Sequence, residues 1–405
     1  MPNEIESLLK EKRIFKPGAE FSKKAQLGTI EEYKRLYDQS INEPEKFWSE
    51  QASKNLHWFK MWDRVLDYDF SSIGKKSAPY LGFFLGGTTN VCYNCLDRHL
   101  ETKKDKIAII WQAEKSGEGK GQKRTLTYQE LYDYVCRFSN VLKRLGVKKG
   151  SVVTIFLPMI PEAAVAMLAC ARIGAIHSVV FSAFSSEALK NRIEDCKSEF
   201  VITADACFYA GKIIELKNKV DKAIEQSRNV KKVIVFNRAN TSVTMKPGRD
   251  LWWHEEINSP EINNHCPPEE AQSEDPLFIL YTSGSTGKPK GVLHTTAGYL
   301  LFAHLTFKYV IDIRNNDIYW CTADVGWITG HSYVVYAPLS NGATTLMFEG
   351  VPTYPDPDRF WQVVEEHKVN IFYTAPTAIR TLMRFGEAWP EKHDLSSLRL
   401  LGTVG

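Results

Sequence analysis

One stretch decides the fold of this chain: Leu280-Tyr281-Thr282-Ser283-Gly284-Ser285-Thr286-Gly287-Lys288-Pro289-Lys290-Gly291-Val292. The apolar run 277–281 predicts a buried strand, and residues 292–294 predict a strand that returns. Between them, glycines permit backbone conformations that other residues avoid. Hydroxyls, backbone N–H groups and two lysines can surround an anion there. We therefore expect a polyphosphate-binding loop at the edge of a sheet.

Two other interpretations of this stretch are weaker. A flexible Gly/Ser linker rarely has apolar strands on both flanks and Lys-Pro-Lys-Gly at its exit. The P-loop of the NTPases requires Gly, four residues, Gly-Lys and then Ser or Thr. Here Thr282 stands at the first Gly position and Pro289 follows Gly287-Lys288. The hydroxyl that would ligate magnesium is absent from that place, so the P-loop pattern does not apply.

The whole stretch resembles the phosphate loop of the adenylate-forming superfamily: acyl-CoA synthetases, luciferases and peptide-synthetase adenylation domains. The resemblance implies that the loop holds the β- and γ-phosphates of ATP, with Mg²⁺, while a carboxylate attacks the α-phosphate. Thr282 and Lys290 are then catalytic through electrostatics, and no residue is assigned as a metal ligand. The implied ATP phosphate-binding residues are Thr282, Ser283, Gly284, Ser285, Thr286, Gly287 and Lys288. A carboxylate nucleophile is already ionised, so His294 and His331 are expected to be pocket or core histidines.

Composition limits the function classes. The 405 residues, 43% apolar and 24% charged, can bury a large core and exceed one ordinary compact domain. A net charge of +3 is too mild to indicate nucleic-acid or membrane-surface binding. We find no signal peptide or membrane span, which predicts a cytoplasmic protein. Its eight cysteines are then expected as reduced thiols, and Cys92-Tyr93-Asn94-Cys95 is not expected to bind metal.

Strand and helix patterns alternate along most of the chain. Strands are predicted over residues 107–111, 152–157, 176–181, 200–203, 232–236, 277–281, 343–348, 369–374 and 398–402. Helices are predicted over residues 161–171, 187–196, 213–225, 298–309 and 357–367, and from a capping box of Thr127 and Glu130 to Gly146. Residues 238–276 are expected to form a connection with one docked helix. The alternation predicts layered α/β sheets, preceded by amphipathic helices such as the one at 30–41.

A second stretch, residues 80–99, resembles the entry motif of the acetyl- and propionyl-CoA synthetases. It implies an N-terminal extension over 1–90 and an adenylation domain over 91–405, incomplete at its C-terminal end. The implied reaction converts ATP, acetate and CoA to acetyl-CoA, AMP and pyrophosphate through acetyl-adenylate. The adenine motif, ribose-binding Asp and C-terminal domain of the family have no counterpart here, so we expect a fragment that is inactive alone. Two alternatives stay open: a propionyl-CoA or other short-chain acyl-CoA ligase, and a non-catalytic remnant that binds a nucleotide or an acyl group.

The segment Tyr319–Ser332 predicts a strand followed by a turn that can approach a ligand. Gly326 and Gly330 free its backbone, and an indole between them can wall off a pocket. By resemblance, Trp327 shortens the acyl pocket to fit acetate. The same resemblance gives Ile328, Thr329 and Val404 as further acetate-pocket residues and Gly405 as the first residue on the adenine side.

The resemblance also implies a CoA site at Phe181, Ser182, Ala183, Tyr209, Lys212, Thr329, Thr353 and Ala375. Here the chain departs from the family pattern. Acetyl-CoA synthetases usually carry Phe-Gly-Gly-Phe-Ser where this chain has Phe-Ser-Ala-Phe-Ser at 181–185, and Arg-Ala-Gly-Arg where it has Tyr-Ala-Gly-Lys at 209–212. Losing one cation and one bidentate fork predicts weaker or altered CoA binding.

Overall fold

The computed structural model describes residues 14–71, 73, 78–114, 121–227, 229–282 and 289–404. The chain divides into two compact units, one up to Trp48 and one from Ser49 onward. The first unit contains α2 (Ala19–Lys24) and α3 (Ile30–Asn42), and α4 (Pro44–Asn55) leads into the second. Thr29 caps α3 by accepting from the Glu32 amide, which confirms the helix predicted at 30–41.

The larger unit contains a seven-stranded sheet that carries the predicted phosphate loop. Its strands lie in the order β12 (Asp250–Trp252), β11 (Lys232–Phe236), β8 (Phe200–Ala204), β6 (Val152–Phe156), β7 (Ile176–Val179), β14 (Pro276–Thr282) and β15 (Lys290–Thr295). All pairs are parallel except β14 with β15. Because β15 is the last strand, the phosphate hairpin lies at a sheet edge, as predicted.

A six-stranded sheet completes the core. Its order is β19 (Leu400–Thr403), β18 (Ile371–Thr374), β16 (Ile318–Cys321), β17 (Thr344–Phe348), β4 (Ile107–Gln112) and β5 (Lys123–Thr127), with only β5 antiparallel. One face packs on α15 (Arg359–His367) and α16 (Pro376–Met383) through an apolar cluster that includes Trp320, Phe360 and Phe372. The predicted layered α/β class is confirmed.

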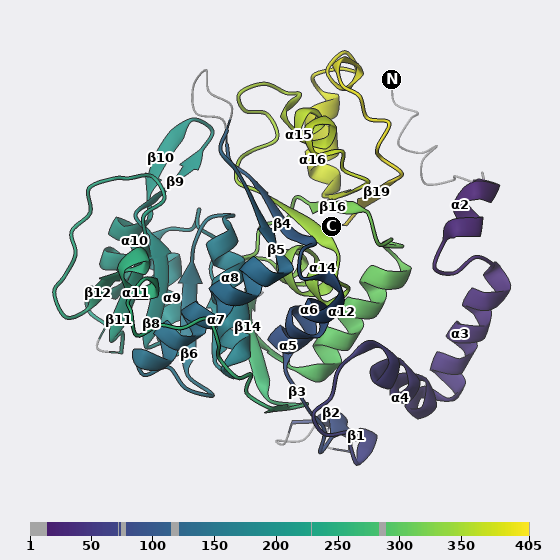
Figure 1. Ribbon diagram of the computed structural model, residues 1–405, viewed down its shortest axis with the longest axis horizontal. Coiled ribbons are helices and arrows are strands. Elements are labelled where there is room, and N and C mark those ends of the chain that lie inside the picture. Colours follow the sequence, from purple (N-terminus) through teal and green to yellow (C-terminus); the bar gives the residue numbers. More distant parts are fainter. Residues whose placement is uncertain are drawn as a thin grey trace. The chain divides into compact units, whose positions relative to one another are not determined.

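Helices fill the space between the sheets (Figure 1). On one side α7 (Tyr128–Arg144) contacts β4 and β5, and on the other α8 (Pro161–Arg172) contacts β6 and β7, while the two helices pack on each other. Every residue of α8 is buried, and its alanines let neighbouring elements approach closely. The predicted capping box of Thr127 and Glu130 begins α7, and Gly146 follows its end at φ +94°.

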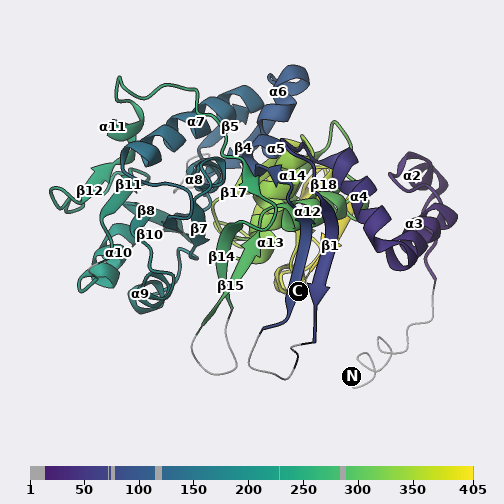
Figure 2. The same ribbon diagram turned by 90° about the horizontal axis from the view of Figure 1, so that it is seen from below.

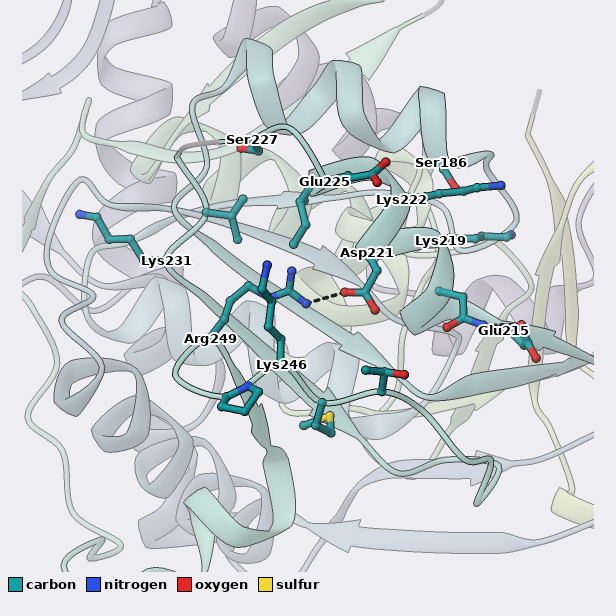
Figure 3. Close-up of a pocket in the computed structure, with 16 residues that line it drawn as sticks. Ser186, Glu215, Lys219, Asp221, Lys222, Glu225, Ser227, Lys231, Lys246 and Arg249 are labelled. Atoms are coloured by element: carbon teal, nitrogen blue, oxygen red, sulfur yellow. Dashed lines mark hydrogen bonds and ion pairs between the residues drawn. The ribbon is translucent and has the colours of Figure 1, made fainter.

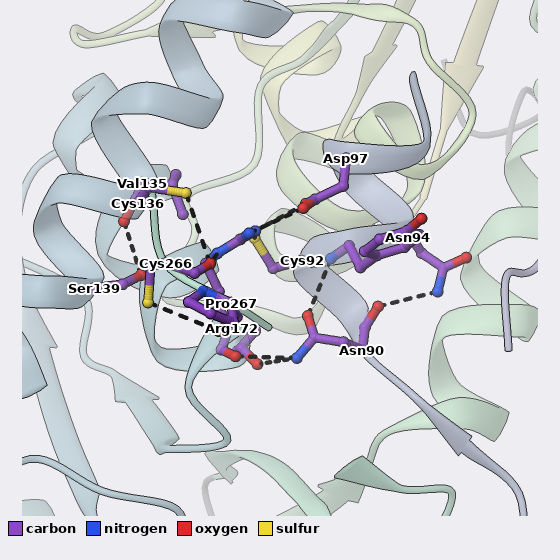
Figure 4. A network of polar contacts seen from close by, with 12 residues as sticks. Asn90, Cys92, Asn94, Asp97, Val135, Cys136, Ser139, Arg172, Cys266 and Pro267 are labelled. Atoms are coloured by element: carbon purple, nitrogen blue, oxygen red, sulfur yellow. Dashed lines mark hydrogen bonds and ion pairs between the residues drawn. The ribbon is translucent and has the colours of Figure 1, made fainter. Parts of the chain in front are cut away.

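A buried guanidinium ties α8 to the elements around it (Figure 4). Arg172 donates to both carboxylate oxygens of Asp97 in α6 (Asp97–Lys103) at 2.8 and 2.9 Å. Its Nε donates to the Cys266 carbonyl at 2.5 Å, and Nη1 lies 3.5 Å from Cys92 Sγ in α5 (Val91–Cys95). All eight cysteines are free, as predicted, and Cys92 serves packing in this network.

Further elements surround these layers. They are β1 (Arg64–Asp69), β2 (Tyr80–Leu85), β3 (Thr88–Thr89), β13 (Ala271–Gln272), α9 (Ser186–Asp195), α11 (Trp253–Ile257), α12 (Ala297–Tyr309), α13 (Ile328–Gly330), the π-helix η1 (His331–Tyr336), α14 (Ala337–Ser340) and η2 (Pro390–Lys392). Within the described ranges, each helix is too short or too polar to span a membrane.

The helix predicted over 213–225 is wrong at its start. Residues 206–215 form a hairpin, β9 (Ala206–Tyr209) with β10 (Lys212–Glu215), and α10 covers only Leu216–Ile224. Ala210 and Gly211 have φ of +49° and +76°, a two-residue turn that joins antiparallel strands directly. The helical period of the apolar residues concealed this turn, because β-branched Ile213 and Ile214 fit a strand equally well. The connection over 238–276 holds α11 and also contributes β12 and β13.

Candidate functional site

The predicted phosphate loop joins two paired strands. Thr282 at the end of β14 lies opposite Lys290 at the start of β15, and both are exposed. The strands run side by side up to this pair (Figure 2). The two residues predicted to be catalytic are therefore cross-strand neighbours. Ser283, Gly284, Ser285, Thr286, Gly287 and Lys288 lie outside the described residues, as does Gly405.

The carboxyl ends of the six-stranded sheet bring two other predicted positions together. The Thr322 amide after β16 donates to the Tyr373 carbonyl at 3.0 Å, and the Thr322 and Thr374 hydroxyls lie 2.6 Å apart. The Val404 amide donates to the Thr374 carbonyl at 3.1 Å. Val404 and Ala375 thus lie at the strand ends where open α/β sheets hold ligands.

A tight turn presents Trp327 beside these strand ends. Asp324 accepts a hydrogen bond from the Gly326 amide at 2.7 Å through Oδ1, and its carbonyl accepts from the Trp327 amide at 3.1 Å. A β-carbon on Gly330 would lie 2.0 Å from the Asp324 carbonyl oxygen, so only glycine fits. Burial raises the pKa of Asp324 to about 6, although the Gly326 amide opposes the shift.

The Trp327 ring meets the loop that follows β7. Its centroid is 6.0 Å from those of Phe181 and Phe184, and Phe181 and Phe184 are 5.6 Å apart. Trp327 is 48% exposed and Ile328 44% exposed, so they line a surface. The structure therefore brings a residue predicted for acetate against one predicted for CoA. Phe184 completes this cluster and was not among the predicted site residues, although it stood in the quoted motif.

His331 lies beneath this turn as a core histidine, as predicted. It is fully buried, its ring lies parallel to that of His177 at 5.6 Å, and its Nδ1 is 3.3 Å from the Trp327 carbonyl. Burial lowers the pKa of His331 to about 3 and also lowers the pKa of His294. A neutral imidazole is thus held at the start of η1, and π-helical turns often occur at functional sites.

The β9–β10 hairpin carries two more of the predicted CoA residues. Tyr209 and Lys212 are cross-strand partners on either side of its turn, and both are exposed. A β-carbon on Gly211 would lie 2.5 Å from the Tyr354 hydroxyl, so the turn approaches the segment that contains Thr353. The ammonium of Lys219 in α10 donates to the Ser182 carbonyl at 3.2 Å, which links the hairpin's helix to the loop of Phe181, Ser182 and Ala183.

A separate hollow of about 1180 Å³ lies beside α10 (Figure 3). Asp221 and Arg249, which line it, pair at 2.5 Å. Asp221 also pairs with buried Lys217 at 2.7 Å, and Lys217 pairs with Asp250 at 2.9 Å. Among the described residues that line it, none belongs to the predicted site. Nothing in this lining connects the hollow to the predicted site, so we assign no chemistry to it.

This arrangement has known counterparts, and the chain belongs to the AMP-binding enzyme family, whose profile matches residues 96–405. A second profile, acetyl-coenzyme A synthetase N-terminus, matches residues 33–95. The chain is 55% identical to an acetyl-coenzyme A synthetase of Bdellovibrio bacteriovorus over 97% of its own length and 59% of that protein. It is 58% identical to one of Rhizobium meliloti over 92% of its length and 56% of that protein.

A solved structure supports the fold. Acetoacetyl-CoA synthetase from Streptomyces lividans superposes with a TM-score of 0.83 at 24% identity, covering 96% of this chain and 56% of that one. The chain thus spans little more than half the length of the relatives that it matches.

Proposed function

We propose that this chain carries the acid-activating site of an AMP-forming acetate–CoA ligase. The chief support is its 55% identity over 97% of its length to an acetyl-coenzyme A synthetase. Residues 91–405 would form the adenylation domain and residues 1–90 its extension. The substrates would be ATP, acetate and CoA, in the cytoplasm, with no nucleic acid or membrane involved.

In the first step, an acetate oxygen attacks the α-phosphorus of ATP, and pyrophosphate leaves with the bonding electrons. Thr282 and Lys290, paired at the strand ends, would help to hold the phosphates with the loop of Ser283 to Lys288. Such fixed donors stabilise the charge that develops at phosphorus. No base is required, because acetate is ionised near neutral pH.

Magnesium would enter with the nucleotide. No group of three His, Cys, Asp or Glu among the described residues could hold a metal ion. Mg²⁺ usually keeps several waters and binds substrate phosphates through few protein ligands, which agrees with this donor set. When bound, the ion would reduce repulsion between carboxylate and triphosphate.

In the second step, the CoA thiol attacks the acetyl carbon and AMP leaves. Trp327, Ile328, Thr329 and Val404 would enclose the acetyl group. Residues proposed to hold CoA are Phe181, Ser182, Ala183, Tyr209, Lys212, Thr329, Thr353 and Ala375. Gly405 would begin the adenine side.

Acid-dependent exchange of pyrophosphate into ATP tests the first step in the full-length protein. Exchange with acetate, less with propionate and little with butyrate is expected. Exchange that favours propionate or butyrate would support another short-chain ligase instead. ATP binding without exchange for any of these acids would support a non-catalytic nucleotide binder.

A further inference from the structure

A buried carboxylate holds the turn of the β9–β10 hairpin. Glu114 follows the end of β4 and is 5% exposed. Its Oε2 accepts from the Ala210 amide and its Oε1 from the Gly211 amide, each at 2.8 Å. The positive φ angles of Ala210 and Gly211 bring these two N–H groups together, as in backbone nests that bind anions.

The same hairpin is braced by a buried ion pair. Arg238, after β11, donates to Glu349, after β17, at 2.7 Å, and both side chains are almost fully buried. The guanidinium lies over the rings of Trp111 in β4 and Phe208 in β9, at 4.9 and 4.8 Å. The seven-stranded sheet, the six-stranded sheet and the hairpin therefore meet at this point.

The hairpin needs such support because it has only two strands. Isolated two-stranded ribbons are marginally stable in water. Tyr209 and Lys212 lie on either side of the turn that Glu114 holds. A carboxylate that accepts two N–H bonds fixes where the Lys212 ammonium and the Tyr209 hydroxyl emerge.

From this geometry we infer that Glu114 is a positioning residue for the CoA acceptor site. The inference rests on the proposed function, since it assigns the hairpin to CoA. Glu114 does not touch CoA itself. It orients the backbone of the turn, and Tyr209 and Lys212, which flank the turn, bind CoA. A single flexible lysine has less pre-organised geometry than an arginine fork, so its supporting turn contributes more to binding.

The test separates the two half-reactions of the full-length protein. Glu114→Gln keeps one acceptor oxygen but turns an amide N–H₂ toward the other backbone N–H. We expect KM for CoA to rise about tenfold or more, as for the loss of a hydrogen bond to a charged group. Acetate-dependent pyrophosphate exchange, which needs no CoA, should stay within about twofold, a ratio that general destabilisation would not produce.

Two further variants, one conservative and one a control, show whether this result is specific to Glu114. Glu114→Asp retains the charge with shorter reach and should give a smaller rise in KM for CoA than Glu114→Gln. Glu162→Gln is the matched control, because Glu162 is also buried but pairs with Arg124 and Tyr134. Glu162→Gln should leave KM for CoA unchanged relative to the rate of pyrophosphate exchange. Equal losses in both half-reactions of Glu114→Gln, or an unchanged KM for CoA, would overturn the inference.

Amide hydrogen exchange at Ala210 and Gly211 supplies a readout without substrate. It should accelerate at least about tenfold in Glu114→Gln and not in Glu162→Gln. If the wild type lacks acid-dependent exchange of pyrophosphate, the proposed function fails while the amide data still report on the turn. Unaltered amide exchange in Glu114→Gln would refute the positioning role itself.

Discussion

Gly326 lies directly against the backbone of Phe181: a β-carbon at position 326 would be 2.9 Å from both the Phe181 nitrogen and its Cα. The turn after β16 and the loop after β7 belong to different sheets, so this approach closes the seam between them. The Trp327 ring lies over the same loop.

Gly326→Ala should therefore destabilise the protein and impair the seam. The neighbouring atoms are backbone and cannot rotate away, so a cost of about 1–3 kcal/mol in the free energy of unfolding is expected. Urea denaturation measures it. Gly298→Ala is the control. Gly298 lies in α12, and a β-carbon there would meet only Phe83 Cβ, at 3.9 Å, so this substitution should be neutral or slightly stabilising. Equal stability of the two variants would contradict this packing.

Trp327→Gly should broaden the acids accepted in pyrophosphate exchange. The indole would overlap the extra carbons of a longer acid. Removing this overlap should change the preference between acids by more than the about 1–3 kcal/mol that one methylene contributes in a pocket that it merely fills. Since the ring also contacts Phe181 and Phe184, KM for CoA should rise as well. Phe184→Leu, which trims the cluster from the other side, should change KM for CoA and leave acid preference unaltered. A Trp327→Gly enzyme that still accepts only acetate would show that Trp327 does not limit the length of the acyl pocket.

Asp97→Asn should strongly destabilise the fold because it leaves the buried Arg172 guanidinium without its anion. Removing one partner of a buried pair typically costs about 3–5 kcal/mol. Thermal and urea unfolding give the change. Lys231→Gln, which breaks an exposed pair with Glu199, is expected to alter stability by about 1 kcal/mol or less. Comparable losses in both variants would show that burial does not set the cost.

Stability should fall as pH is lowered below about 6.5. Burial lowers the pKa of each of His99, His304 and His331 to about 3, so the unfolded chain binds these protons first. Asp324, with a pKa of about 6, opposes them by binding its proton in the folded state. Between about pH 4 and 6 the unfolded chain therefore binds, at these four groups, about two protons more than the folded protein. The free energy of unfolding should then fall by about 3 kcal/mol for each pH unit.

His304→Asn tests this titration. The variant should reduce the pH slope of the unfolding free energy by about 1.4 kcal/mol per pH unit, since one proton no longer binds on unfolding. Urea denaturation at several pH values measures the slope. A slope that is the same in His304→Asn and wild type would contradict the role of burial.

Much of this fold could be predicted because local pattern and final structure agree. The Thr127 capping box and the strands at 107–111 and 232–236 carry short-range signals that packing reinforces. The hairpin at 206–215 could not be predicted, since an Ala-Gly turn with Ala at positive φ has no strong local preference.

The pairing of Trp327 with Phe181 and the role of Glu114 depend on which strands become neighbours. An acidic residue at the end of a strand signals a site only after the sheet order is known. Both sheets contain strands distant in sequence, such as β4 beside β17, so their order is a tertiary property.

Because Glu114 binds main-chain N–H groups, its hydrogen bonds to the turn do not depend on the side chains that flank the turn. Positions 209 and 212 can therefore exchange residues while the turn stays in place, since the two backbone donors belong to positions 210 and 211. The acceptor-binding chemistry of such a protein can drift by substitution at two surface positions, without the scaffold having to be re-evolved.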